Sequence, residues 1–225
     1  MIKKILWVAS TLNIIASVVF LTLIPEQKIA VHFGVDGTPN RWGSKWEMLI
    51  ICWIPLALNI FFVIYQNVTK NNSKYNKNRK IENIVIPAII LFFVCLNWLM
   101  LTSVFDRTNT ENSPLPRWFF AILMVSFGIL FIIMGNFMGK IQQNRSLGMR
   151  IYWTLHNKIV WKKAHRLYGL LCVVCGFLIL IFGGLSVVFK FNFLSMFIVF
   201  FVLVIISFIV PSVYSYWLYH KLEKK

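Results

Sequence analysis

The chain has 225 residues, of which 59% are hydrophobic and only 13% are charged, and its mean hydropathy is +0.73. A soluble domain of this length would have too little polar surface to cover so apolar a chain, so the composition excludes a soluble globular protein. The formal net charge of +16 would suit a nucleic-acid-binding protein, but the placement of the cationic residues along the chain offers another explanation.

Six apolar segments reach the length of about 20 residues that a helix needs to cross a bilayer. In chain order they are Ile5–Ile24, Met48–Gln66, Ile84–Phe105, Trp118–Met138, Leu167–Phe189 and Phe193–Tyr219. The segments are continuously apolar and do not alternate, which indicates helices and not the strands of a barrel. No small-residue cleavage site follows the first segment, so we expect it to be retained. The sequence therefore predicts an all-α, multi-pass membrane protein with a bundle of six transmembrane helices.

The Lys and Arg residues are distributed unevenly between the connecting segments. On one side of the expected membrane lie only six of the 23, namely Lys28, Arg41, Lys45, Arg107, Arg117 and Lys190. The other seventeen lie in the segments of the opposite side and at the two ends of the chain. Because loops rich in Lys and Arg stay in the cytoplasm, we expect both termini to be cytoplasmic. Topology and attraction to membrane lipids account for the excess charge, so we expect no direct binding to nucleic acid.

Loop composition divides the chain into three expected units. Residues 1–66 form an N-terminal two-helix unit with a patterned outer loop at 25–46. Residues 67–116 hold an inner loop rich in Asn and Lys, which we expect to be solvated, then the third helix and an outer turn. Residues 117–225 form a three-helix unit with a long inner segment at 138–166.

The outer loop contains the stretch IAVHFGVDGTPNRWGSKW. Gly34 and Gly37 favour turns, and Ile29, Val31 and Phe33 alternate with other residues, so a short strand or hairpin is expected. A compact lid anchored by aromatic rings is one interpretation. The other is a recognition surface for a peptide or lipid, with these candidate residues: His32, Asp36, Pro39, Arg41 and Trp42.

The inner segment contains the stretch RIYWTLHNKIVWKKAHR, residues 150–166. Thr154 is expected to cap a helix that begins near Leu155 and continues into the fifth membrane segment without a break. On such a helix Trp161 and His165 lie one turn apart, beside a stripe of basic residues. A basic amphipathic helix lying in the headgroup plane is the alternative to a specific functional site.

Within the membrane segments, no Asp, Glu, Lys or Arg lies at a helix centre, which argues against an ion-driven pump. Cys172 and Cys175 match the pattern C-x-x-C inside an apolar helix, where we expect small packing residues and no redox site. Gly135, Gly176 and Gly183 mark close-packing surfaces. Contacts inside the bundle and contacts between copies of the chain both fit that pattern.

Three stretches together resemble one family. GNFMGKIQQNRSLGMRIYWTLHNKIVWKKAHRLYG, residues 135–169, resembles the signature of the SdpI family, the bacterial immunity proteins against a sporulation-delaying toxin peptide. PEQKIAVHFGVDGTPNRWGSK looks like the small domain of unknown function that commonly precedes it, and VPSVYSYWLYHK is similar to the family's tail. Family members often have Pro in place of Gly139 and Tyr152 and Thr in place of Ala164, so local backbone details differ.

The resemblance implies a protein of the bacterial cell membrane that gives resistance to a secreted, membrane-active toxin peptide. It also implies a second role, because the founding member holds a cytoplasmic transcriptional repressor at the membrane when toxin is present. The outer-loop residues would then meet the toxin, and the inner segment would support the repressor or a conformational change. The candidate residues of the inner segment are Asn136, Asn144, Gly148, Arg150, Trp153, Thr154, Trp161, His165 and Arg166. Which toxin is recognised does not follow from the family.

A membrane-embedded enzyme and a peptide exporter are the alternatives. His32, His156 and His165 are the candidate metal ligands or bases, but His32 is expected on the opposite side of the membrane from the other two. A zinc site needs three or four ligands close together, and a general base needs an orienting partner. An exporter would need a nucleotide-binding motif or a buried charge. We therefore expect no enzymatic activity, no cofactor and no metal, and the oligomeric state stays open.

Overall fold

The computed structural model describes residues 2–25, 28–71, 76–106 and 114–223. In this part of the chain, six helices are long and apolar enough to cross a membrane. They are α1 (Ile2–Leu23), α2 (Leu49–Val68), α4 (Arg79–Asp106), α5 (Arg117–Met138), α7 (Lys158–Phe189) and α8 (Phe193–Glu223). The predicted bundle of six helices is confirmed. Residues 72–75 of the Asn- and Lys-rich loop and residues 107–113 of the outer turn lie outside the described residues.

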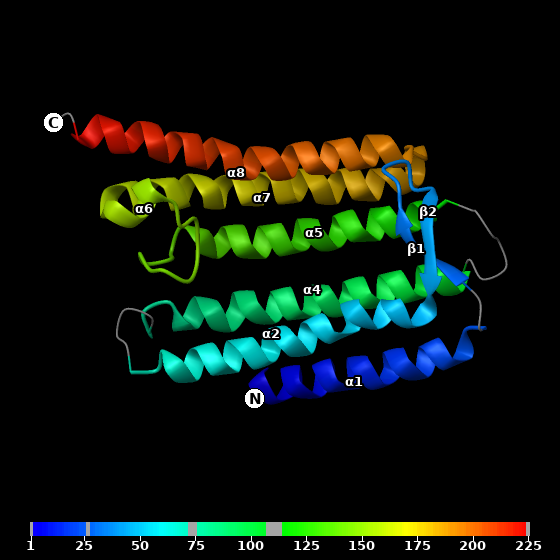
Figure 1. Cartoon of the computed structure of the whole chain (residues 1–225). Coiled ribbons are helices and arrows are strands. Elements are labelled where there is room, and N and C mark those ends of the chain that lie inside the picture. Colours follow the sequence, from blue (N-terminus) through cyan, green and yellow to red (C-terminus); the bar gives the residue numbers. More distant parts are fainter. Residues whose placement is uncertain (1, 26–27, 72–75, 107–113, 224–225) are drawn as a thin grey trace.

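The six helices lie side by side in two groups of three (Figure 1). Helices α1, α2 and α4 contact one another, as do α5, α7 and α8, and α4 contacts α5 along the seam between the groups. We call one end of the bundle the hairpin end, because a β-hairpin covers it, and the other the α6 end, after a short helix there (Figure 1). Helix α8 ends at the α6 end, and α1 starts part-way along the bundle and runs to the hairpin end.

Helices α5 and α7 are held in backbone contact by glycines that face each other. A Cβ added at Gly135 would lie 2.7 Å from the carbonyl oxygen of Gly169, and one added at Gly128 would lie 2.7 Å from that of Gly176. Small residues allow this close approach, which gives van der Waals packing where lipid removes the hydrophobic driving force. The close-packing surfaces of Gly135 and Gly176 therefore lie inside the bundle.

Polar side chains join the three helices of the first group. The amide of Asn97 on α4 donates to Asn13 Oδ1 at 3.2 Å and to Ser17 Oγ at 2.9 Å, both on α1. Asn13 in turn donates to the carbonyl oxygen of Cys52 on α2 at 3.2 Å. Each such bond contributes on the order of 1 kcal/mol between membrane helices. Because lipid offers these Asn side chains no other hydrogen-bond partner, the bonds favour the arrangement in which the three helices lie together.

The expected hairpin is present, and it forms a small two-stranded sheet beside the helices. Strand β1 (Lys28–Phe33) pairs antiparallel with β2 (Pro39–Ser44), with Ala30 opposite Trp42. Gly37 in the turn has φ +81, a conformation that glycine adopts without strain. A 3-10 helix, η1 (Lys45–Met48), then leads into α2.

The hairpin contacts both groups of helices. Ile29 at its base packs with Leu21 of α1 and Leu101 of α4. At its tip the Gly37 carbonyl accepts a hydrogen bond from the amide of Leu115, just before α5, at 2.8 Å. Gly37 also lies so close to α8 that an added Cβ would be 2.9 Å from the Phe193 ring. The hairpin is therefore a strap across the hairpin end (Figure 1).

We predict that Gly135→Ala lowers the midpoint of thermal unfolding of the purified protein, because the added methyl group must push α5 away from α7. Overpacking of this kind costs about 1–3 kcal/mol. The matched control is Gly184→Ala on α7, where an added Cβ meets nothing within 4 Å. Equal midpoints for the two variants would contradict the close contact of the helices.

Candidate functional site

The inner segment does not form the continuous helix predicted from sequence. Helix α6 (Tyr152–His156) is a short piece, and Asn157 then takes an extended conformation with φ −135 and ψ 119. Its side-chain oxygen accepts from the amides of Ile159 at 2.8 Å and Val160 at 3.2 Å, so Asn157 is the N-cap of α7. The prediction that Thr154 caps this helix was wrong. Asn is an equally good N-cap residue, and Asn157 lies directly before the first residue of α7.

Thr154 instead stabilises the turn that precedes α6. It is fully buried, its hydroxyl donates to the carbonyl oxygen of Met149 at 2.6 Å, and it accepts from the amide of Ile151 at 3.2 Å. Gln143 caps the C-terminal end of α6. Its side-chain amide donates to the carbonyl oxygens of Thr154 at 2.8 Å and Leu155 at 2.9 Å. These carbonyls at the end of a helix would otherwise lack a partner. Sequence reasoning missed Gln143.

His165, Trp161 and Gly148 form one buried unit. The imidazole of His165 stacks on the Trp161 ring at 3.9 Å and an interplanar angle of 20°. Its Nδ1 donates to the Trp161 carbonyl at 2.9 Å, and its Nε2 accepts from the amide of Met149 at 2.9 Å. These partners require the neutral ring with its proton on Nδ1. Gly148 has φ +90, and a Cβ there would collide with the imidazole.

Trp161 and Asn144 fix the loop between α5 and α6. The indole Nε1 of Trp161 donates to the carbonyl oxygen of Ile141 at 2.8 Å. Asn144 accepts at Oδ1 from the amides of Ser146 at 2.6 Å and Leu147 at 2.7 Å. The buried residues of the predicted signature therefore hold the loop to α7, and their role in this structure is positional.

The inner loop that was expected to be solvated and the start of α4 each hold a buried polar residue: Asn78 connects the two groups of helices, and Glu82 links α4 to α2 within the first group. Asn78 is 1% exposed, and its amide donates to the Gln142 carbonyl at 3.0 Å and accepts from the Gln142 amide at 2.9 Å. Glu82, also 1% exposed, pairs with Arg79 at 3.1 Å and accepts from the Tyr65 hydroxyl at 3.1 Å. The prediction of a solvated loop was therefore wrong at Asn78. The single carboxylate in a basic run was the signal that could have identified Glu82.

The other candidate residues of the inner segment do not lie together in one site. Arg150 and Arg166 are exposed, and Arg150 donates to the carbonyl oxygen of Arg145 at 2.9 Å. Trp153 packs edge-on against Tyr216 of α8, with ring centroids 5.1 Å apart. Asn136 is exposed on α5. The signature thus divides into a buried framework and a more exposed cationic rim.

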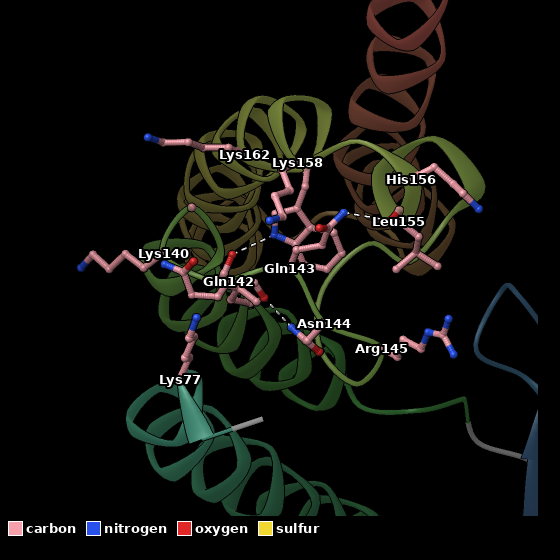
Figure 2. A pocket seen from close by; sticks show the side chains of 13 residues that line it. Lys77, Lys140, Gln142, Gln143, Asn144, Arg145, Leu155, His156, Lys158 and Lys162 are labelled. Atoms are coloured by element: carbon pink, nitrogen blue, oxygen red, sulfur yellow. Dashed lines mark hydrogen bonds between the residues drawn. The ribbon is translucent and has the colours of Figure 1, made fainter. Parts of the chain in front are cut away.

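A hollow of about 1110 Å³ opens beside this framework at the α6 end. Figure 2 shows Lys77 pointing into it from the side of α4, toward Gln142. Six lining side chains are cationic or can become so, namely Lys77, Lys140, Arg145, His156, Lys158 and Lys162. In the described part of the chain, no group of three or more His, Cys, Asp and Glu side chains could hold a metal ion.

The five candidate residues of the outer loop all lie on the hairpin, at the opposite end of the bundle. Asp36 accepts from the amide of Thr38 at 3.0 Å and from its hydroxyl at 2.7 Å, and these bonds hold the pKa of the carboxyl below its usual value. Arg41 forms an ion pair with Glu47 of η1 at 2.8 Å.

These contacts give the five residues different roles. His32 bonds to Asn40 at 2.6 Å across the sheet, and Pro39 is half-buried where β2 begins. Trp42 projects from β2 and is 37% exposed. Asp36 and Arg41 therefore stabilise the hairpin, and Trp42 presents a partly exposed apolar ring.

Two regions of the chain match known families. Residues 140–215 match the SdpI/YfhL protein family, and residues 9–61 match a domain of unknown function, DUF1648. Over 215 residues the chain is 26% identical to a protein named "Immunity protein SdpI" from Bacillus subtilis (strain 168), an alignment that covers 94% of this chain and 93% of that relative. No solved structure matches the chain.

We predict that Gly148→Ala destabilises the α6 end, because the added methyl group displaces the His165 ring and strains a backbone with positive φ. The cost should be about 1–3 kcal/mol and should appear as a lower unfolding midpoint. The control is Gly139→Ala, where the added Cβ would lie 3.6 Å from the Cα of Arg166, an ordinary contact. A Gly148→Ala variant as stable as the control would refute the role of the buried unit.

Proposed function

The chain belongs to the SdpI family, and on this premise we propose that it is an immunity protein of the bacterial membrane that protects the cell against a secreted, membrane-active toxin peptide. The observation that carries the proposal is the similarity to an immunity protein over nearly the whole length of both chains. It spans the hairpin, all six helices and the inner segment, so the two polar ends of the bundle are included.

We place the α6 end in the cytoplasm and the hairpin end outside. The support is the uneven distribution of Lys and Arg, because the basic segments gather at the α6 end while few cations lie at the hairpin end. In this orientation the hairpin is the part that a secreted peptide meets first, and the cationic rim of the inner segment faces cytoplasmic partners.

The hairpin is suited to receive a membrane-active peptide. Trp42 and Val35 are exposed on it, at 37% and 55%, and such a peptide must have apolar side chains of its own. The tip of the hairpin touches Leu115 and Phe193, so a displaced hairpin alters contacts with the second group of helices. We propose that toxin sensing uses this strap, and that α7 carries the change to the α6 end, where a cytoplasmic repressor would dock.

We propose a non-enzymatic mode of action. His165 has both ring nitrogens bonded to backbone groups, so it is not available as a base or a metal ligand. His32 lies on the hairpin, at the opposite end of the bundle from His156. His32 and His156 therefore cannot act together in one catalytic site. Protection by binding the toxin is the mode of action that these positions support.

The proposal is tested by a killing assay. A sensitive bacterium that expresses the chain is exposed to candidate membrane-active toxin peptides, including the peptide resisted by a strain that carries the Bacillus subtilis relative. We expect survival at toxin concentrations that kill cells with an empty vector. Unchanged killing by every peptide, with the protein present in the membrane, would reject the immunity function.

Trp42→Ala should reduce this protection by about tenfold or more in the toxin concentration tolerated, since exposed Trp residues often dominate peptide contacts. The amount of protein in the membrane should not change, because Trp42 is partly exposed and lies outside the helices. Trp53→Ala is the matched control, since Trp53 is 53% exposed on α2. Equal protection by both variants would exclude Trp42 from toxin recognition.

The orientation is tested by labelling in a variant whose four native cysteines are replaced by alanine. Lys190→Cys, between α7 and α8, should react with a membrane-impermeant maleimide in intact cells. Lys163→Cys, near the start of α7, should react only after the membrane is permeabilised. The reverse pattern would place the hairpin end in the cytoplasm.

A further inference from the structure

The hollow at the α6 end lies on the seam between the two groups of helices. Lys77 approaches from the side of α4, and the rest of the lining comes from residues 139–145, α6 and the first turns of α7 (Figure 2). Gln142, which lines the hollow, is bonded to Asn78 on the other side of the seam. A ligand that contacts Lys77 together with the rest of the lining would therefore touch both groups.

The hollow is strongly electropositive. None of the lining residues that the structure describes carries a carboxylate, and the nearby Glu82 is already paired with Arg79. Figure 2 shows Lys140 and Lys162 at one edge of the hollow and Arg145 and His156 at the other, with the ends of these side chains directed outward. Like charges gathered in a concave site repel one another and raise the local concentration of anions. A bound anion would relieve this repulsion.

The position of the hollow along the helices indicates the source of the anion. The candidate span of α5 ends at Met138 and that of α7 begins at Lys158, and the lining residues Lys140 and Lys158 lie directly at these two ends. The hollow is therefore at the depth of the lipid headgroups. Basic pockets between membrane helices at this depth suit the phosphate groups of anionic lipids.

We infer that this hollow binds the phosphate headgroup of an anionic phospholipid. Ammonium groups of Lys77 and Lys158 pair with the phosphate oxygens, and Gln142 and Gln143 supply amide groups on the wall of the hollow. The volume of about 1110 Å³ exceeds what a single inorganic phosphate fills and accommodates a whole headgroup. Bound lipid would fasten the α4 side to the α5–α7 side at this end. The inference rests on the proposed orientation and not on the immunity function.

The test uses the purified full-length protein in a mild neutral detergent. Vesicle lipids are added, either phosphatidylglycerol or cardiolipin as the anionic probe and phosphatidylcholine as the neutral one, and binding is followed by native mass spectrometry and by the unfolding midpoint. We expect the anionic lipids to stay bound and to raise the midpoint, and phosphatidylcholine to do neither. Equal binding of all three lipids would overturn the inference.

A triple variant, Lys77→Gln, Lys140→Gln and Lys158→Gln, should bind anionic lipid about tenfold more weakly or worse. The control variant removes three exposed charges that do not line the hollow, Lys80→Gln, Lys163→Gln and Lys221→Gln, and should bind as the unmodified protein does. The same three lining positions changed to Arg should keep the affinity, which separates charge loss from misfolding. If the Gln triple variant and the control lost affinity for anionic lipid equally, the lipid would be attracted to the basic surface in general. That result would overturn the proposed site.

Two further probes distinguish other ligands for the same charges. Inorganic phosphate should not raise the midpoint at the concentrations where phosphatidylglycerol does, and an equal effect would assign the hollow to a soluble phosphate compound. A glutamate-rich peptide should compete poorly, and displacement of lipid by it at lower concentration would assign the hollow to an acidic protein partner. Because none of these measurements uses toxin, a failed killing assay and a failed lipid test are independent results.

Discussion

The backbone contact between α5 and α7 is the constraint on which the rest of the α6 end depends. With Gly135 against Gly169, the two helices lie so close that the loop leaving α5 must fold back over the start of α7. Trp161 and His165 then reach the loop backbone and form hydrogen bonds with it. A wider spacing would separate these partners and leave buried donors and acceptors unpaired, which is costly in an apolar environment.

The two groups of helices are joined by polar contacts at both ends of the bundle. At the α6 end Asn78 bonds to Gln142 and Tyr65 to Ser146, and at the hairpin end Leu115 bonds to Gly37. Lipid solvates the apolar helix faces between these ends as well as another helix does, so apolar contact alone is a weak link. The ends are therefore where an external peptide or a bound lipid would have most influence on how the groups sit against each other.

This division fits the toxin sensing that we propose for this protein. The hairpin carries exposed Trp42 and is tied to η1 by the ion pair of Arg41 with Glu47. The α6 end carries a rigid, buried framework under an exposed basic rim. The buried signature residues hold the backbone that carries this rim.

The sequence by itself determined the six membrane helices, the hairpin and the family, because length, hydropathy and turn residues are local signals. It also indicated that Trp161 and His165 belong together, since they lie one turn apart on a helix. Only the tertiary structure decided that Gly135 faces Gly169 inside the bundle, that Asn78 and Glu82 are buried, and that scattered lysines surround one hollow. Those features depend on which distant segments meet. An Asn in a polar loop looks the same in sequence whether its partner is water or, as for Asn78, a carbonyl group 64 residues further along the chain.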